Sequence, residues 1–342
     1  MDTGWDGSRS LSADLILEGG GVRGLGLVGA VSVLTDAGYR FRRTAGTSAG
    51  AIVSAVLAAL ASSGESYDRL EDIARSIDLR RFRDHGRVGS AMAKVGLSPL
   101  AALFSALFRD GAYAGRFLRQ WLESTLADLG VRTFGDLRLD DPGSDLPPEK
   151  QYALVVIVTD LSRQRMVCLP WDYADYGLDP DEQSVAEAVR ASASIPFFFR
   201  PVTLHSRQPE GRNTLVDGGV LSNYPVTIFD RRDGSPPRWP TLGVRLGAEE
   251  PATVRKRKPV KGLLNLGVST VETMMLAHDA YQLAQPENKA RTIFVDCSDT
   301  SAIDFDIDRK RQETLLRTGR TCAEKFLQNW DFGRFVADYR KV

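Results

Sequence analysis

The sequence has little cysteine. Only Cys168, Cys297 and Cys322 occur among 342 residues, and none belongs to a CxxC pair or to a Cys/His pattern. An odd number of cysteines without such spacing argues against a disulfide framework and against a zinc site. We therefore expect free thiols and a cytoplasmic protein without a bound metal.

The sequence also lacks an excess of charge and a long apolar run. It has 44 Lys and Arg against 44 Asp and Glu, so no general positive field predicts nucleic-acid binding. Residues 1–13 form a polar N-terminal segment without the basic-then-apolar order of a signal peptide. No later run reaches about 18 unbroken apolar residues. We expect a soluble protein whose membrane contact is at most peripheral.

Strand-like and helix-like segments alternate along the chain. Strands are predicted at 15–17, 41–46, 152–159, 214–216, 242–246 and 292–296, and helices at 25–37, 51–61, 116–129, 185–193, 268–284 and 309–328. The β-branched run 152–159 indicates a central strand buried on both faces, with 165–169 as its hairpin partner. Alternation without internal repeats predicts an α/β fold with a mainly parallel central sheet sandwiched between helices. We expect one domain over 14–342, of which 260–342 supplies the C-terminal strand and helices.

A first glycine-rich turn separates the first strand from the first helix. It consists of Gly19, Gly20, Gly21, Val22, Arg23 and Gly24. The turn satisfies GxGxxG, but the second strand does not end in the acid that dinucleotide binding requires, and no P-loop lysine follows. Backbone N–H groups at a helix N-terminus bind permanent negative charge or charge that develops in a transition state. Arg23 would either strengthen this field or form a structural ion pair.

A second glycine-rich turn contains the best candidate for a nucleophile. It consists of Gly46, Thr47, Ser48, Ala49 and Gly50, a GxSxG sequence between a strand and a helix. A strand that turns sharply into a helix presents a serine hydroxyl at the turn. The following helix, 51–61, is apolar nearly all round but is too short to span a membrane and contains Ser54, which favours burial under a sheet.

A nucleophilic serine needs a base, and the chain has only three histidines, His85, His205 and His278. The order Ser48, Asp217, His278 fits an α/β-hydrolase triad. However, the catalytic histidine of that fold lies on a loop after a strand, whereas His278 falls in the middle of a predicted helix.

Asp217 is the competing candidate for the base. It ends a predicted strand, and Gly218 and Gly219 then let the chain turn away and leave the carboxylate exposed in a crevice. An aspartate acting alone must gain basicity from partial desolvation or bond directly to the serine. Taken by itself, the DGG sequence also fits a turn cap.

The combined motifs resemble the patatin-like phospholipase family. EGGGVRG, GTSAG and DGG occur in the order typical of that family, and ASASIPFFFRPV precedes DGGVLSNYP in a similar way, over about 15–246. The resemblance implies that Ser48 is the nucleophile, that Asp217 is the base of a Ser–Asp dyad, and that the first glycine-rich turn forms the oxyanion hole. It also implies hydrolysis of acyl esters in phospholipids, lysophospholipids or related lipids, without calcium or another cofactor.

Three other hypotheses stay open. One is an esterase that uses Ser48, Asp217 and His278; another is a non-catalytic anion-binding module. The third is a regulated, membrane-damaging effector of patatin type. The basic run 80–87 fits contact with anionic lipid, and the apolar segment 97–108 and basic loop 255–261 fit gating, but all three also fit ordinary structural roles. The sequence leaves the acyl chain, the headgroup and the oligomeric state open.

Overall fold

The computed structural model describes residues 11–84, 113–249 and 285–340, with a few positions between 260 and 273. Several predictions lie outside these residues. They concern His85, His278, segment 97–108, most of 255–261 and most of the predicted helix 268–284.

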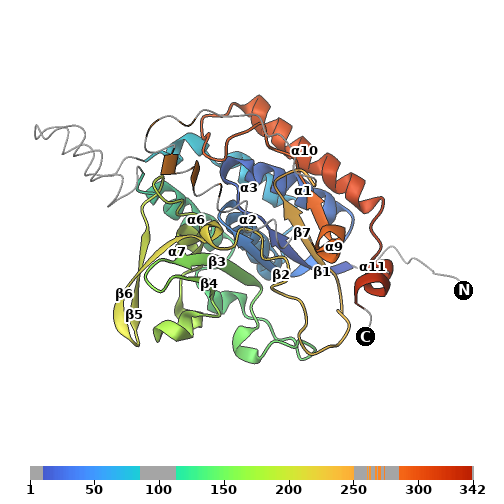
Figure 1. The fold of residues 1–342 in the computed structure, drawn as a ribbon, viewed down its shortest axis with the longest axis horizontal. Helices are drawn as coiled ribbons and strands as arrows, with labels where there is room; N and C mark the ends of the chain where they lie inside the picture. Colours follow the sequence, from blue (N-terminus) through green and yellow to red (C-terminus); the bar gives the residue numbers. More distant parts are fainter. Residues whose placement is uncertain are drawn as a thin grey trace, which may run out of the picture.

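The described strands form one mixed sheet (Figure 1). They are β1 Leu11–Leu17, β2 Tyr39–Thr47, β3 Leu154–Asp160, β4 Arg165–Leu169, β5 Val202–Arg207, β6 Glu210–Asp217, β7 Thr241–Arg245 and β8 Thr292–Phe294. The order is β5-β6-β3-β2-β1-β7-β8, and β4 also pairs with β3. The strands from β8 to β3 are parallel, whereas β4, β5 and β6 are antiparallel to their partners.

Helices flank this sheet. The described helices are α1 Gly24–Asp36, α2 Ala49–Ser63, α3 Arg69–Ser76, α6 Arg116–Asp128, α7 Val185–Ser192, α9 Pro286–Ala290, α10 Arg309–Leu327 and α11 Phe332–Tyr339. Three short 3-10 turns, η1 Gly21–Arg23, η2 Leu79–Phe82 and η7 Gly218–Val220, lie near the site described below. Figure 1 shows α10 crossing beside α1, and the two helices pack together. The predicted fold class is confirmed.

Alternate residues of the central strands face two buried layers. Leu15, Leu17, Val156 and Val158 belong to the larger core under the helices. Ile16, Ala45, Val155 and Ile157 pack on the opposite face against Tyr224, Val226 and Phe229. Because successive strand residues point to opposite faces, a strand buried on both sides is apolar throughout. This burial explains the continuous β-branched run of β3.

β3 brings two distant parts of the chain together. β2 pairs with β3 as far as Ile157, whose partner is Thr47. β6 pairs with the residues of β3 that follow, beginning with Val158, whose partner is Asp217. β4 pairs with β3 over 156–160, which includes residues that pair with β2 and residues that pair with β6. Because β4 takes one edge of β3, β2 and β6 must share the other edge. β2 and β6 therefore run toward each other and end at neighbouring residues of β3.

The sequence did not predict β5 or α11, and it predicted only three residues of β6. The first half of β6, Glu210–Asn213, is charged or polar and largely exposed, and β5 is exposed at alternate positions. This hairpin lacks the apolar alternation on which strand prediction depends. The hairpin of β3 and β4 is confirmed, with Ile157 opposite Cys168.

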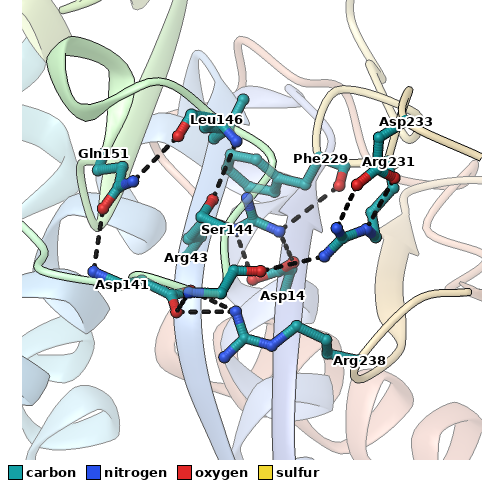
Figure 2. A network of polar contacts seen from close by, with 11 residues as sticks. Asp14, Arg43, Asp141, Ser144, Leu146, Gln151, Phe229, Arg231, Asp233 and Arg238 are labelled. Carbon is teal, nitrogen blue, oxygen red and sulfur yellow. Dashed lines mark hydrogen bonds and ion pairs between the residues drawn. The ribbon is translucent and has the colours of Figure 1, made fainter. Parts of the chain in front are cut away.

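Figure 2 shows a network of ion pairs and hydrogen bonds that includes Asp14 of β1 and Arg43 of β2. Arg43 of β2 donates to both carboxylate oxygens of Asp14 on β1, at 3.0 and 2.6 Å. Burial raises the pKa of Asp14, and the Arg43 guanidinium opposes this shift. Arg238 donates to Asp141, and Arg231 to Asp233. Each arginine labelled in Figure 2 thus has a carboxylate partner, which indicates a structural role.

Candidate active site

Ser48 lies at the sharp turn between β2 and α2. Its φ is 53° and its ψ is −119°, a backbone conformation that is rare for a residue other than glycine. Neither of the two glycines that flank it, Gly46 and Gly50, has room for a side chain. A Cβ on Gly46 would lie 2.3 Å from the Gly50 carbonyl carbon, and a Cβ on Gly50 would lie 2.1 Å from the Leu17 oxygen. The GxSxG glycines therefore allow the strand, the turn and the helix to pass in close contact.

Asp217 ends β6 and is followed directly by η7. Its Oδ1 accepts the Gly219 N–H at 2.8 Å, and its Oδ2 has no hydrogen bond of standard geometry among the described residues. The side chain is only 1 % exposed, so the expectation of an exposed carboxylate is wrong. Burial raises the pKa of Asp217 to about 7, against the opposing effects of the Ser48 hydroxyl and the Gly219 N–H.

The structure brings Ser48 and Asp217 together. The Ser48 hydroxyl is close enough to lower the pKa of Asp217, and the strands that carry the two residues end side by side on β3. His205, the one histidine in the described ranges, is exposed on β5 and pairs with Arg212 on β6. The role of His278 stays a prediction.

The first glycine-rich turn passes directly beside Ser48. A Cβ on Gly19 would lie 3.1 Å from the Ser48 Cβ, and a Cβ on Gly21, whose φ is +56°, would lie 2.0 Å from the Ala302 oxygen. Val22 N–H donates to that same Ala302 oxygen at 3.0 Å. Glycine is therefore required for this close approach.

Two amides of this turn are available for a ligand. The N–H groups of Gly20 and Gly21 donate to no acceptor in the described part of the chain, whereas Gly19 N–H donates to the Asn223 oxygen. They lie at the start of η1, which leads into α1, where backbone N–H groups favour negative charge. This arrangement suits an oxyanion that forms next to Ser48.

Arg23 has a structural contact. Its Nε donates to the Thr300 carbonyl oxygen at 2.7 Å and so ties the turn to the chain that follows β8. This is a hydrogen bond to the backbone rather than the ion pair considered from the sequence.

Asn223 also holds the first glycine-rich turn, a role that the sequence did not predict. Its side-chain Nδ2 donates to the Gly19 oxygen at 3.2 Å, and its main-chain carbonyl oxygen accepts the Gly19 N–H at 3.4 Å. The side chain is 7 % exposed, and its Oδ1 is buried without a partner among the described residues. The only signal in the sequence was its position shortly after DGG.

An apolar pocket of ≈ 100 Å³ adjoins Ser48 and Gly21. Its walls come from α1, α2, α3, η2 and α6, and the described side chains that line it, apart from Ser48, are all apolar. They include Leu25, Val28, Ile52, Val53, Val56, Leu70, Ile73, Phe82, Leu118, Trp121, Phe199 and Phe305. An apolar wall beside a hydroxyl and two amides suits a hydrocarbon chain attached to a polar ester.

The described ranges contain no group of three or more His, Cys, Asp or Glu side chains placed to hold a metal ion. Within the same ranges, no helix combines the length and the apolar character that crossing a bilayer requires.

Comparisons with known proteins agree with this geometry. Residues 15–230 match the family model described as patatin-like phospholipase. The chain is 35% identical over 321 residues to the uncharacterised protein YqhO of Bacillus subtilis, across 93% of this chain and 99% of that protein. It is 29% identical to an uncharacterised NTE family protein of Mycobacterium tuberculosis, of which it covers 28%. The chain belongs to the patatin-like phospholipase family, as the sequence motifs predicted.

Two solved structures are similar at lower identity. VipD from Legionella pneumophila aligns with a TM-score of 0.48 and 14% identity, over 92% of this chain and 66% of that one. ExoU, in its complex with SpcU from Pseudomonas aeruginosa, aligns with a TM-score of 0.49 and 20% identity, over 94% of this chain and 52% of the ExoU chain. The chain therefore spans about half the length of ExoU.

Proposed function

We propose that this chain is a serine acyl hydrolase that cleaves ester bonds of phospholipids, lysophospholipids or related lipids. The observation that carries the proposal is the meeting of Ser48 with the buried carboxylate of Asp217 on one edge of β3. The unbonded amides of Gly20 and Gly21 and the adjoining apolar pocket support it. Membership of a family of lipid hydrolases favours the same chemistry.

The reaction runs through an acyl-enzyme. Asp217 accepts the Ser48 proton while the Ser48 oxygen attacks the ester carbonyl carbon, and the amides of Gly20 and Gly21 bind the oxyanion that forms. The carbonyl re-forms as the alcohol or lysolipid leaves with the proton from Asp217. Water then attacks the acyl-enzyme, with Asp217 again as base, and releases the fatty acid and the free serine.

The environment of Asp217 suits this role. A base works best when its pKa lies near the working pH, and burial raises the pKa of Asp217 to about 7. An ordinary aspartate, with a pKa of about 4, would be a much weaker base. The apolar pocket would hold the acyl chain while the carbonyl lies between Ser48 and the two amides.

Lipid hydrolysis can be tested with a total lipid extract and mass spectrometry of the lipids that disappear. Ser48→Ala and Asp217→Ala should each abolish fatty-acid release. Ser54→Ala is a matched control, because Ser54 is a fully buried serine of α2 that does not line the pocket. His278→Ala should keep its activity, whereas loss of fatty-acid release in His278→Ala as well as in Asp217→Ala would instead support the α/β-hydrolase hypothesis, in which all three residues form a triad. A wild-type protein that consumes no lipid would support the binding module.

A further inference from the structure

The C-terminal turn of α7 contacts both members of the dyad. Ser192 is the last residue of α7, Ser194 follows its C-cap, and both are 0% exposed. Ser192 bonds to the main chain of Ser48, and Ser194 bonds to the main chain of Asp217. One short segment, which supplies neither the nucleophile nor the base, therefore connects the backbones of both.

Ser192 forms a bridge where β2 leaves β3. Its Oγ accepts the Ser48 N–H at 2.8 Å and donates to the Ile157 oxygen at 2.6 Å. Thr47, which pairs with Ile157, is the last residue of β2 in this ladder, because the chain then turns into α2. The Ser192 hydroxyl thus satisfies two buried backbone groups at the point where the strand ladder stops.

Ser194 makes a different set of contacts. Its carbonyl oxygen accepts the Asp217 N–H at 2.9 Å. Its hydroxyl donates to the Arg190 oxygen at 2.9 Å and accepts from Arg190 Nη1 at 2.5 Å. Among the described residues, the Ser194 hydroxyl therefore forms hydrogen bonds only with Arg190. The bond between Ser194 and the dyad is made by its main chain.

We propose that Ser192 is a positioning residue for the nucleophile. Its hydroxyl fixes the Ser48 amide and so maintains the positive φ that directs the Ser48 oxygen toward Asp217 and the first glycine-rich turn. A non-glycine residue keeps such a strained conformation only where its surroundings impose it. The inference rests on the proposed function, since it concerns the same serine.

The experiment measures the rate at which a fluorophosphonate labels Ser48 in folded protein. Ser192→Ala should lower this rate about 100-fold, as expected for a misplaced reacting group. It should lower kcat on a lipid ester while leaving KM and the pH midpoint of the reaction unchanged. Ser194→Ala is the matched control: it removes an equally buried hydroxyl with two hydrogen bonds from the same turn, and should label at close to the wild-type rate.

A second pair of variants covers the case in which Ser192→Ala does not fold. Ser192→Thr and Ser192→Val have nearly the same shape but differ in the hydroxyl, so the threonine variant should label much faster than the valine variant. The positioning role would be overturned if Ser192→Thr and Ser192→Val were labelled at equal rates. It would also be overturned if Ser192→Ala were labelled as fast as Ser194→Ala. If Ser48→Ala then still abolishes labelling, the proposed function stands. Wild-type protein that takes no label overturns both.

Discussion

At the scale of the residue, the ionisation of Asp217 governs the proposed reaction. Only the carboxylate form can accept the Ser48 proton, and burial raises the pKa of this carboxyl to about 7. The rate of hydrolysis should therefore rise with pH through about 7 and level off above it. A profile of kcat/KM between pH 5 and 9 measures this. A rate that is already level at pH 5, as a base with a pKa of about 4 would give, would show that Asp217 is not the base or is not desolvated.

The same desolvation should affect stability. Because the folded pKa of Asp217 exceeds the unfolded value of about 3.9, the folded state holds a proton that the unfolded state has lost, and stability falls as pH rises from about 4 to about 7. The loss is on the order of 4 kcal/mol when complete. Asp217→Asn removes this dependence.

Asp217→Asn should therefore have a higher free energy of unfolding than the wild type at pH 8. The difference between the two proteins should be larger at pH 8 than at pH 5. Urea unfolding at both pH values measures the difference, with Ser48→Ala as a control that keeps the carboxyl group. A difference between Asp217→Asn and the wild type that does not change with pH would show that burial does not hold the carboxyl in its neutral form.

The candidate dyad could be predicted from the sequence, but its supports could not. Glycines must flank a serine at a strand-to-helix turn, so Ser48 leaves a pattern of spacing, and Asp217 does so through the glycines after it. Ser192 and Asn223 act through hydrogen bonds to main-chain groups far away in the sequence. Such bonds impose no spacing that can be recognised before the fold is known.

At the scale of the element, helix α2 connects the nucleophile to the pocket. Ser48 precedes its first residue, and Ile52 and Val56 follow along the same face at intervals of about one turn. All three line the pocket. An acyl chain bound with its carbonyl at Ser48 would therefore extend along α2 toward Val56.

Val56→Phe should shorten this pocket. We expect a loss of about tenfold or more in kcat/KM for a long-chain ester, because the added ring occupies the far end, and little change for a butyryl ester. The short-chain substrate acts as the internal control for folding. An equal loss on both esters would show that the acyl chain does not extend along this face of α2.

Helices and strands could be predicted where burial leaves a recognisable pattern of apolar residues. β3 is apolar from Leu154 to Val158 because it is covered on both faces, and the central strands and most helices were located from such patterns. The β5–β6 hairpin is polar and partly exposed, so it left no comparable signal, although β6 delivers Asp217. The part of the sheet that completes the site was thus the least visible in the sequence.

At the scale of the whole molecule, the sheet separates chemistry from structural support. Ser48 directly follows the end of β2, whereas Arg43 lies earlier on the same strand, about 15 Å back at the usual rise per residue. Arg43 and its partner Asp14 belong to the network in Figure 2. The Asp14 and Arg43 side chains are only 2% and 11% exposed. Removing one partner leaves a charge buried without its counterion.

Asp14→Ala should therefore lower the free energy of unfolding by about 3 to 5 kcal/mol. Protein that remains folded should still label at Ser48 at the wild-type rate. Asp141→Ala, which breaks the more exposed pair with Arg238, should cost less. Chemical denaturation and labelling of the same samples separate the two effects, and slow labelling of folded Asp14→Ala would show that the network is coupled to the site.

The site and the rate of covalent labelling test whether Ser48 and Asp217 act as a dyad. Wild-type protein, Ser48→Ala and Asp217→Asn are treated with a fluorophosphonate, and peptide mass spectrometry locates the label over time. With a Ser48–Asp217 dyad, we expect a single label on Ser48 in the wild type, none in Ser48→Ala, and labelling slowed about 100-fold or more in folded Asp217→Asn. A wild-type rate in Asp217→Asn, or a label on another serine, would contradict it.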